Sequence, residues 1–107
     1  MKEVRIEIRP QMLPVVQEAL RACSGCPGMS VSTIQTYPPP PSGEGGPPKL
    51  KEDLTEFINR VRIEIVTSDE TAEALYDAAV KVLEHGRTGD SSVRMSEVER
   101  ATFLHRR

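Results

Sequence analysis

Hydrophobic and polar residues alternate in four stretches of the chain. These stretches are Val4–Arg9, Met29–Tyr37, Ile58–Val66 and Ser92–Val98. A period of two is typical of β-strands with one buried face, so each stretch is predicted to be a strand. In the first and third stretches the second face carries charged side chains. That charged face must be solvated or ion-paired across a contact.

Two intervening stretches have helical spacing. From Leu13 to about Cys23, apolar residues recur every three or four positions, and Pro14 is compatible with a first helical turn. Thr67–Glu70 has the pattern of a capping box, and an apolar stripe follows as far as Glu84. The predicted order is βαββαβ, the ferredoxin-like α+β plan, in which an antiparallel four-stranded sheet carries two helices on one face.

Length and composition fit a single domain over residues 1–107. The chain is 37% hydrophobic with no Trp, so its aliphatic core is modest and oligomerisation would add buried surface. A net charge of −2 and a pI near 5.7 exclude the basic footprint of nucleic-acid binding. No stretch approaches the roughly 20 apolar residues of a membrane span and no signal-peptide core is present, which predicts a cytoplasmic protein without membrane insertion.

Residues 38–48 hold six of the nine prolines and three of the seven glycines. Such a composition favours neither strand nor helix, and it predicts a loop at about 38–57 between two strands. A mobile functional loop, an insertion without a task and a polyproline ligand for an aromatic groove are all compatible with it.

A glycine-containing turn follows the second helix. Gly86 and Gly89 let the backbone bend tightly and direct several N–H groups to one side, an arrangement suited to a phosphate. Arg87 adds a permanent positive charge. Further hydroxyl donors are Thr88, Ser91 and Ser92. The alternative is a glycine-capped helix end that runs into an ordinary turn.

Cys23 and Cys26 form a C-x-x-C pair. The pair is a possible redox site, half of a metal site, or two unrelated thiols. Zinc normally requires four ligands, and His85 and His105 stand at no recognisable ligand spacing, so no metal site is predicted.

The chain resembles the PII signal-transduction proteins. The resemblance rests on the segments Met1–Pro10, Val15–Leu20, Gly28–Val31, Val61–Val66 and Gly86–Asp90, of which the G-R-x-G-D turn after the second helix is the most specific. It implies a homotrimer that binds an adenine nucleotide in each cleft between subunits. It also implies that the 38–57 loop contacts a partner, either a membrane transporter or a regulatory or metabolic protein.

Residue by residue, the resemblance assigns the site as follows. The phosphates fall to Gly86, Arg87 and Gly89, with Arg60 as a nearby basic residue. The nucleotide site includes the neighbouring positions Thr88, Asp90, Ser91 and Ser92. The adenosine is expected against Gly28, Met29, Ser30, Glu64 and Val66.

Several positions depart from the family pattern. Ser91 and Ser92 stand where the family has a glycine and a lysine, and Phe103 and His105 replace two phosphate-reaching arginines. With less positive charge available, ADP or AMP is as well accommodated as ATP. The loop lacks the glutamine that helps hold magnesium and 2-oxoglutarate, and the tyrosine for uridylylation. The chain is thus similar to carboxysome-associated members, which implies bicarbonate and a link to inorganic carbon uptake.

Other functions remain open from the sequence. One is a nitrogen-regulatory PII protein that senses ATP and 2-oxoglutarate. Another is a small phosphatase, although the only asparagine is Asn59 and neither histidine has an assignable carboxylate partner. A third is a proline-rich adaptor. A regulator without catalytic residues is the prediction.

Overall fold

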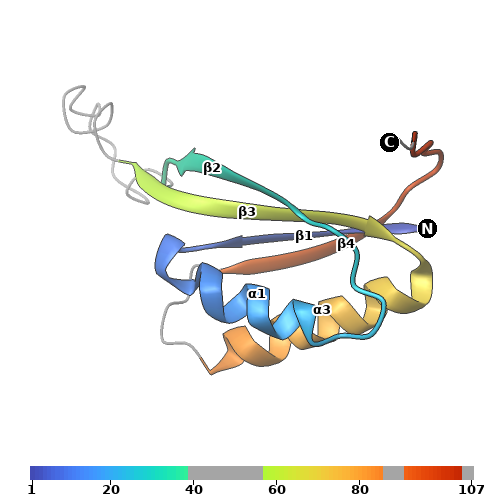
Figure 1. Ribbon diagram of the computed structural model, residues 1–107. Coiled ribbons are helices and arrows are strands. Elements are labelled where there is room, and N and C mark those ends of the chain that lie inside the picture. The colour runs from blue at the N-terminus through green and yellow to red at the C-terminus, as the bar shows by residue number, and fades with distance from the viewer. Residues whose placement is uncertain (39–56, 86–90, 105–107) are drawn as a thin grey trace, which may run out of the picture.

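The computed structural model describes residues 1–38, 57–85 and 91–104. Its elements are β1 (Lys2–Ile8), η1 (Pro10–Met12), α1 (Leu13–Arg21), β2 (Ser30–Thr36), β3 (Ile58–Thr67), α3 (Asp69–Glu84) and β4 (Ser92–Glu97). The strands form one antiparallel sheet in the order β2-β3-β1-β4, and both helices lie on one face of it (Figure 1). The predicted ferredoxin-like α+β fold is confirmed.

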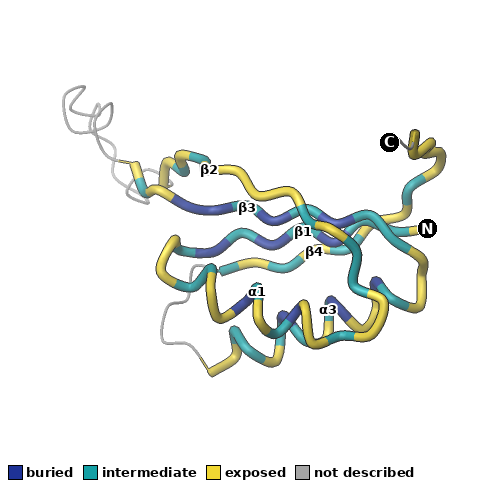
Figure 2. Tube along the Cα trace, in the orientation of Figure 1, coloured by how far each residue is buried: buried dark blue, intermediate teal, exposed yellow. Residues whose placement is uncertain are grey.

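The register of the central strands sends alternate side chains to opposite faces of the sheet. Val4 lies opposite Ile65, and Ile6 lies opposite Ile63, so the apolar sides of β1 and β3 coincide. The helices cover this side and complete the core (Figure 2). The buried core comprises Val4, Ile6, Ile8, Val16, Leu20, Val61, Ile63, Ile65, Ala72, Leu75 and Ala79.

The edge strand β2 shows the limit of the alternation pattern. Val31 lies opposite Ile63 on the helix side of the sheet, and Thr33 lies opposite Val61. Both side chains are nevertheless exposed, because the helices lie beneath the other strands (Figure 2). The pattern therefore predicted the strand correctly but not a buried face.

A tight turn ends α1 at Arg21, before the predicted end at Cys23. The Cys26 N–H donates a hydrogen bond to the Cys23 carbonyl at 3.3 Å, and Gly25 has a φ of 79°. This φ lies in the left-handed region, which an L side chain rarely adopts. The turn that holds both cysteines therefore depends on glycine.

Replacing Gly25 by Ala is expected to lower the free energy of unfolding by about 1–2 kcal/mol, since the methyl group is strained at positive φ. Urea denaturation at fixed protein concentration measures this change. Gly28→Ala is the matched control. Gly28 has open space around the position of an added Cβ and no positive φ, so its substitution should be close to neutral. Equal losses in both variants would contradict the turn's requirement for glycine.

The starts of both helices differ from the prediction. The predicted capping box paired the first and last residues of Thr67–Glu70. In the structure the Ser68 Oγ caps α3 instead, by accepting a hydrogen bond from the Thr71 N–H at 3.3 Å. Before α1, the chain makes the 3₁₀ turn η1, which begins at Pro10 and was not predicted. A proline at a helical first position loses no intrahelical hydrogen bond, which explains why the turn tolerates it.

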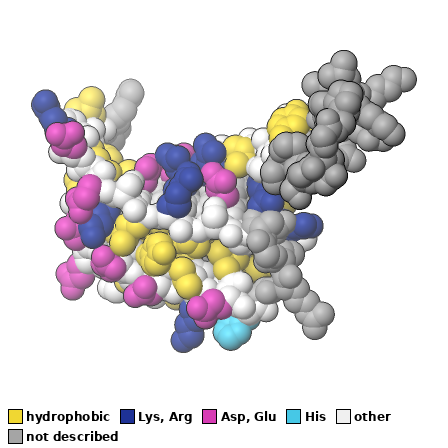
Figure 3. All heavy atoms as spheres, turned by 180° about the vertical axis from the view of Figure 1, so that it is seen from behind, with side chains coloured by type: hydrophobic (Ala, Val, Ile, Leu, Met, Phe, Trp, Pro, Cys, Tyr) yellow, Lys and Arg dark blue, Asp and Glu magenta, His cyan; other side chains and the backbone are white. Residues whose placement is uncertain are grey.

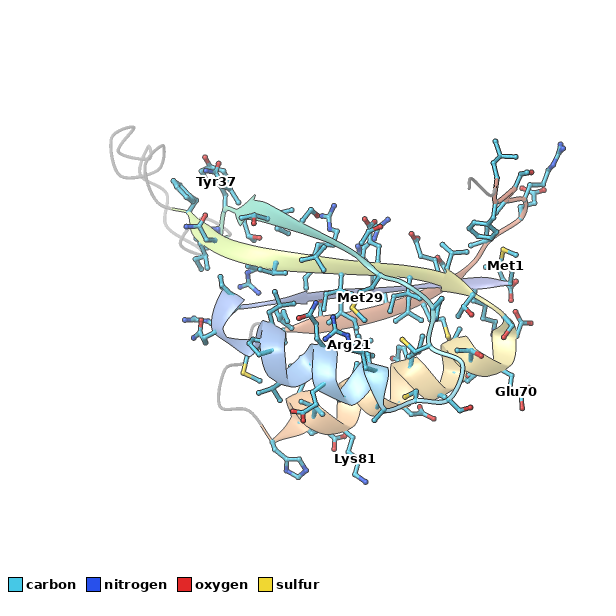
Figure 4. The ribbon with its side chains drawn as sticks, in the orientation of Figure 1. Met1, Arg21, Met29, Tyr37, Glu70 and Lys81 are labelled. Atoms are coloured by element: carbon cyan, nitrogen blue, oxygen red, sulfur yellow. The ribbon has the colours of Figure 1, made fainter. Side chains whose placement is uncertain are left out.

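An aromatic pair marks the two ends of the connection between β2 and β3. Tyr37 is labelled in Figure 4. The centroid of its ring lies 5.8 Å from that of the Phe57 ring. The predicted 38–57 loop otherwise falls on residues 39–56, outside the described residues. None of the described helices has the length and hydropathy needed to cross a bilayer.

Candidate functional site

A cavity of about 430 Å³ opens at the end of the sheet where β1 begins and β3 ends. Segments far apart in the sequence form its wall. The lining residues are Glu3, Pro27, Gly28, Ser30, Glu64, Val66 and Phe103. The size is typical of a small-molecule site.

The strand register explains why these residues meet. Ser30 lies opposite Glu64, and Glu3 lies opposite Val66. Since side chains alternate along a strand, all four point to the sheet face away from the helices. Gly28 immediately precedes β2, and the space where its Cβ would be is empty. The backbone therefore leaves room for a ligand beside the strand ends.

The cavity gathers four of the residues predicted to contact adenosine, namely Gly28, Ser30, Glu64 and Val66. Met29 lines an adjoining cavity instead. Arg60 is buried on β3, four residues from Glu64 on the same sheet face. At about 3.3 Å per residue, that places its Cα about 13 Å from the Cα of Glu64, outside the cavity wall.

The predicted phosphate turn, Gly86, Arg87, Thr88, Gly89 and Asp90, lies outside the described residues. Its following residues are described. Ser92 begins β4 opposite Glu7, and the buried Ser91 Oγ has no hydrogen-bond partner among the described residues.

An arginine outside the cavity wall fixes two of its carboxylates. Arg5 NH2 lies 3.0 Å from Glu64 Oε2 and 3.5 Å from Glu3 Oε1. Because a carboxylate accepts several hydrogen bonds, Glu64 can bind a further donor while it stays paired with Arg5. Among the described lining residues none is Lys or Arg, and the carboxylates of Glu3 and Glu64 can accept hydrogen bonds from donor groups of a ligand.

The same sheet face continues as an ion-pair network. Arg62 Nε lies 3.0 Å from Glu7 Oε2, and Arg94 NH2 lies 3.8 Å from the same oxygen. In the view from behind, basic and acidic side chains mix over the sheet, and hydrophobic side chains gather below them (Figure 3). The predicted charged face is thus ion-paired within the described residues.

A second cavity, of about 390 Å³, adjoins the first. Pro27 and Gly28 line both cavities. The other lining residues of the second are Gln17, Arg21, Cys26 and Met29. Arg21 and Met29 lie beside each other in Figure 4, and the Gln17 side-chain amide lies 3.9 Å from Met29 Sδ. The Pro27–Gly28 segment therefore forms a common wall.

The cysteine pair borders this common wall. Both thiols are free and half-buried. Burial, and then the neighbouring Cys23, raises the pKa of the Cys26 thiol, while Arg21 opposes the shift. Among the described residues, no group of three or more His, Cys, Asp or Glu side chains comes together as a metal site.

Glu3 and Pro27 line the cavity but were not predicted as site residues. Glu3 lies in the wall because β1 pairs with β3, which brings together residues about sixty positions apart in the sequence. Pro27 directly precedes Gly28, and this adjacency was the available signal. Phe103 was recognised only as a departure from the family pattern, yet it lines the cavity.

Comparison with known proteins agrees with this architecture. The family model described as Nitrogen regulatory protein P-II matches residues 1–102. The chain belongs to the PII family. Nitrogen regulatory protein P-II of Rhizobium meliloti (strain 1021) is 31% identical over 102 residues, which cover 92% of this chain and 87% of the relative. The Cereibacter sphaeroides protein of the same name is 31% identical, covering 94% and 88%.

An archaeal relative extends the comparison. Nitrogen regulatory protein P-II 2 of Methanothermobacter thermautotrophicus is 30% identical over 105 residues, covering 92% of this chain and 84% of the relative. PII proteins are regulators that act on partners, so this chain is a regulatory protein and not an enzyme. The phosphatase alternative is thereby set aside.

Proposed function

We propose that this PII protein is a cytoplasmic homotrimer that binds ADP, AMP or ATP in clefts between subunits. The nucleotide shifts the 38–57 loop between forms that differ in affinity for a partner protein. The observation that carries the proposal is the cavity in which Gly28, Ser30, Glu64 and Val66 meet. It offers a carboxylate to the amino or hydroxyl donors of adenosine and open space at Gly28.

The strand order supports clefts that two protomers share. Ser30 lies on the edge strand β2, whereas Ser92, next to the predicted phosphate turn, lies on the opposite edge strand β4. The inter-strand spacings between these edges add up to about 14 Å. A nucleotide held at both ends by one chain would have to cross the ion-paired sheet face. Two adjacent protomers can instead supply one end each.

The described part of the cavity wall contains Phe103 and no Lys or Arg. The resemblance implies an arginine at the position of Phe103 in the family. The γ-phosphate of ATP would then gain less here, and ADP or AMP should bind comparably well. Bicarbonate, with a link to carbon uptake, is proposed as a second ligand on the resemblance alone. The names of the relatives favour nitrogen regulation as the alternative, for which the resemblance implies 2-oxoglutarate as the second ligand.

A thermal-shift screen with AMP, ADP, ATP, bicarbonate and 2-oxoglutarate tests the proposal. A ligand that binds the folded state raises the melting temperature in proportion to the logarithm of its concentration. We expect such a rise with at least one adenine nucleotide. No shift with any of the three at millimolar concentration would refute nucleotide sensing. Bicarbonate or 2-oxoglutarate is the second ligand if its addition raises the temperature further.

Replacing Glu64 by Gln is expected to weaken adenine-nucleotide binding about five- to thirtyfold, the equivalent of about 1–2 kcal/mol for a hydrogen bond to a charged acceptor. Isothermal titration calorimetry measures the change. Glu7→Gln is the matched control, because Glu7 pairs with Arg62 at 3.0 Å on the same face but does not line the cavity. Similar losses in both variants would attribute the effect to the ion-pair network instead of ligand contact.

A further inference from the structure

The turn between α1 and β2 holds both cysteines of the chain. Cys26 lines the second cavity, which shares Pro27 and Gly28 with the proposed nucleotide site. A hydrogen bond of 3.3 Å from the Cys26 N–H to the Cys23 carbonyl closes this turn. The end residues of such a turn have Cα atoms less than about 7 Å apart, which overlaps the separation of disulfide-bonded cysteines. The backbone therefore already permits a bond between the two sulfurs.

The sulfurs occupy different contacts in the dithiol form. Cys23 Sγ lies 3.7 Å from the Ala19 carbonyl oxygen and 3.8 Å from that of Ala74, between the two helices. Cys26 Sγ lies 3.4 Å from the Pro27 carbonyl oxygen. Bond formation would require both side chains to rotate and leave these contacts. Because Cys26 is bonded to Pro27 and its sulfur contacts the Pro27 carbonyl, a new conformation of Cys26 would also alter the backbone at Pro27.

Pro27 and Gly28 line both cavities, so a movement there reaches the adenosine end of the site. We propose that Cys23 and Cys26 form a reversible intramolecular disulfide that reshapes the Pro27–Gly28 wall and weakens nucleotide binding. The effect on binding rests on the proposed function, whereas the disulfide itself does not.

The oxidant is a low-molecular-weight disulfide. Cys26 borders the open cavity. Burial raises the pKa of its thiol, so the exchange is run at alkaline pH, where the Cys26 thiolate attacks one sulfur of that disulfide and releases one small thiolate. The Cys23 thiolate then attacks the Cys26 sulfur and releases the second. Two protein thiols and one small disulfide thus give one protein disulfide and two small thiols. The two electrons pass to the small disulfide, and excess small thiol reverses both exchanges.

The test is oxidation of the full chain with oxidised glutathione, followed by three measurements on the same sample. We expect both thiols to become resistant to alkylation, with a mass loss of two hydrogens and no link between chains. Hydrogen exchange should change in the peptide that contains Pro27 and Gly28. The dissociation constant for ADP, measured by calorimetry, should rise about tenfold, or about 1.4 kcal/mol, and dithiothreitol should restore it.

Cys26→Ser is the control, and its ADP affinity should be the same before and after the oxidant. In Cys23→Ala the exchange should stop at a mixed disulfide on Cys26, seen as a gain of one glutathione unit in mass, which identifies Cys26 as the sulfur that reacts first. Thiols that stay alkylatable, a bond between chains, or a bond that leaves exchange and ADP affinity unchanged would each overturn the proposal. If the reduced protein binds no ADP, the nucleotide proposal fails, while alkylation and exchange still decide whether the switch exists.

Discussion

Replacing Leu20 by Ala should lower the free energy of unfolding by about 2–5 kcal/mol, the range typical of a buried leucine truncated in a core. Leu20 is 0% exposed and is among the largest fully buried side chains. It belongs to the cluster that joins α1 to the sheet and α3. Truncation leaves a cavity at this position. The surrounding residues belong to the strands and the second helix, so they can shift only slightly to fill it.

Val15→Ala on the same helix is the matched control. Val15 is 49% exposed, so its truncation should change stability by no more than about 0.5 kcal/mol. Both variants are measured by urea denaturation at one protein concentration, since the stability of the proposed trimer would depend on concentration. Comparable losses at Leu20 and Val15 would contradict the packing of α1 through the face that carries Leu20.

Replacing Gly28 by Leu should lower the affinity for adenine nucleotides by about a hundredfold or more, the equivalent of about 2.8 kcal/mol. An added Cβ at Gly28 meets no atom within 4 Å, so the fold can accommodate a side chain there. Gly28 lines both cavities, so a leucine side chain there would occupy space that the nucleotide is proposed to fill. The substitution should therefore obstruct the ligand while leaving stability nearly unchanged.

Ala22→Leu serves as the control for added bulk. Ala22 is exposed at the end of α1 and lines neither cavity, so its substitution should leave nucleotide affinity unchanged. Calorimetry gives the affinity, and a thermal melt without ligand checks folding. Wild-type affinity in a folded Gly28→Leu protein would mean that the nucleotide does not bind in this cavity.

The central strands β1 and β3 were predictable because apolar and charged residues alternate within each of them. In β1, the alternation of Val4, Ile6 and Ile8 with charged residues marks both the strand and its buried face. In β2 the same pattern identified the strand but not its environment, since an edge strand's burial depends on where the helices lie. The end of α1 was missed because the turn at Gly25 competes with a favourable helical stripe up to Cys23.

Some residues of the candidate site were predictable from the sequence and others were not. Gly28, Ser30, Glu64 and Val66 were assigned through resemblance to a family, and the register then explains why they meet. Glu3 could not be assigned, since its place in the wall follows from the pairing of β1 with β3. Adjacency across a sheet depends on which strands pair and in which register, and the pattern of one strand alone does not specify its neighbour.

The proposed function requires an adenine nucleotide to bind the cavity where β1 begins and β3 ends. Titration of isotope-labelled protein with ADP, followed through backbone amide chemical shifts, tests it most directly. We expect saturable shifts at Gly28, Ser30, Glu64 and Val66, which line the cavity. An ADP titration that leaves these four amides unmoved up to millimolar concentration, whether or not others shift, would contradict it.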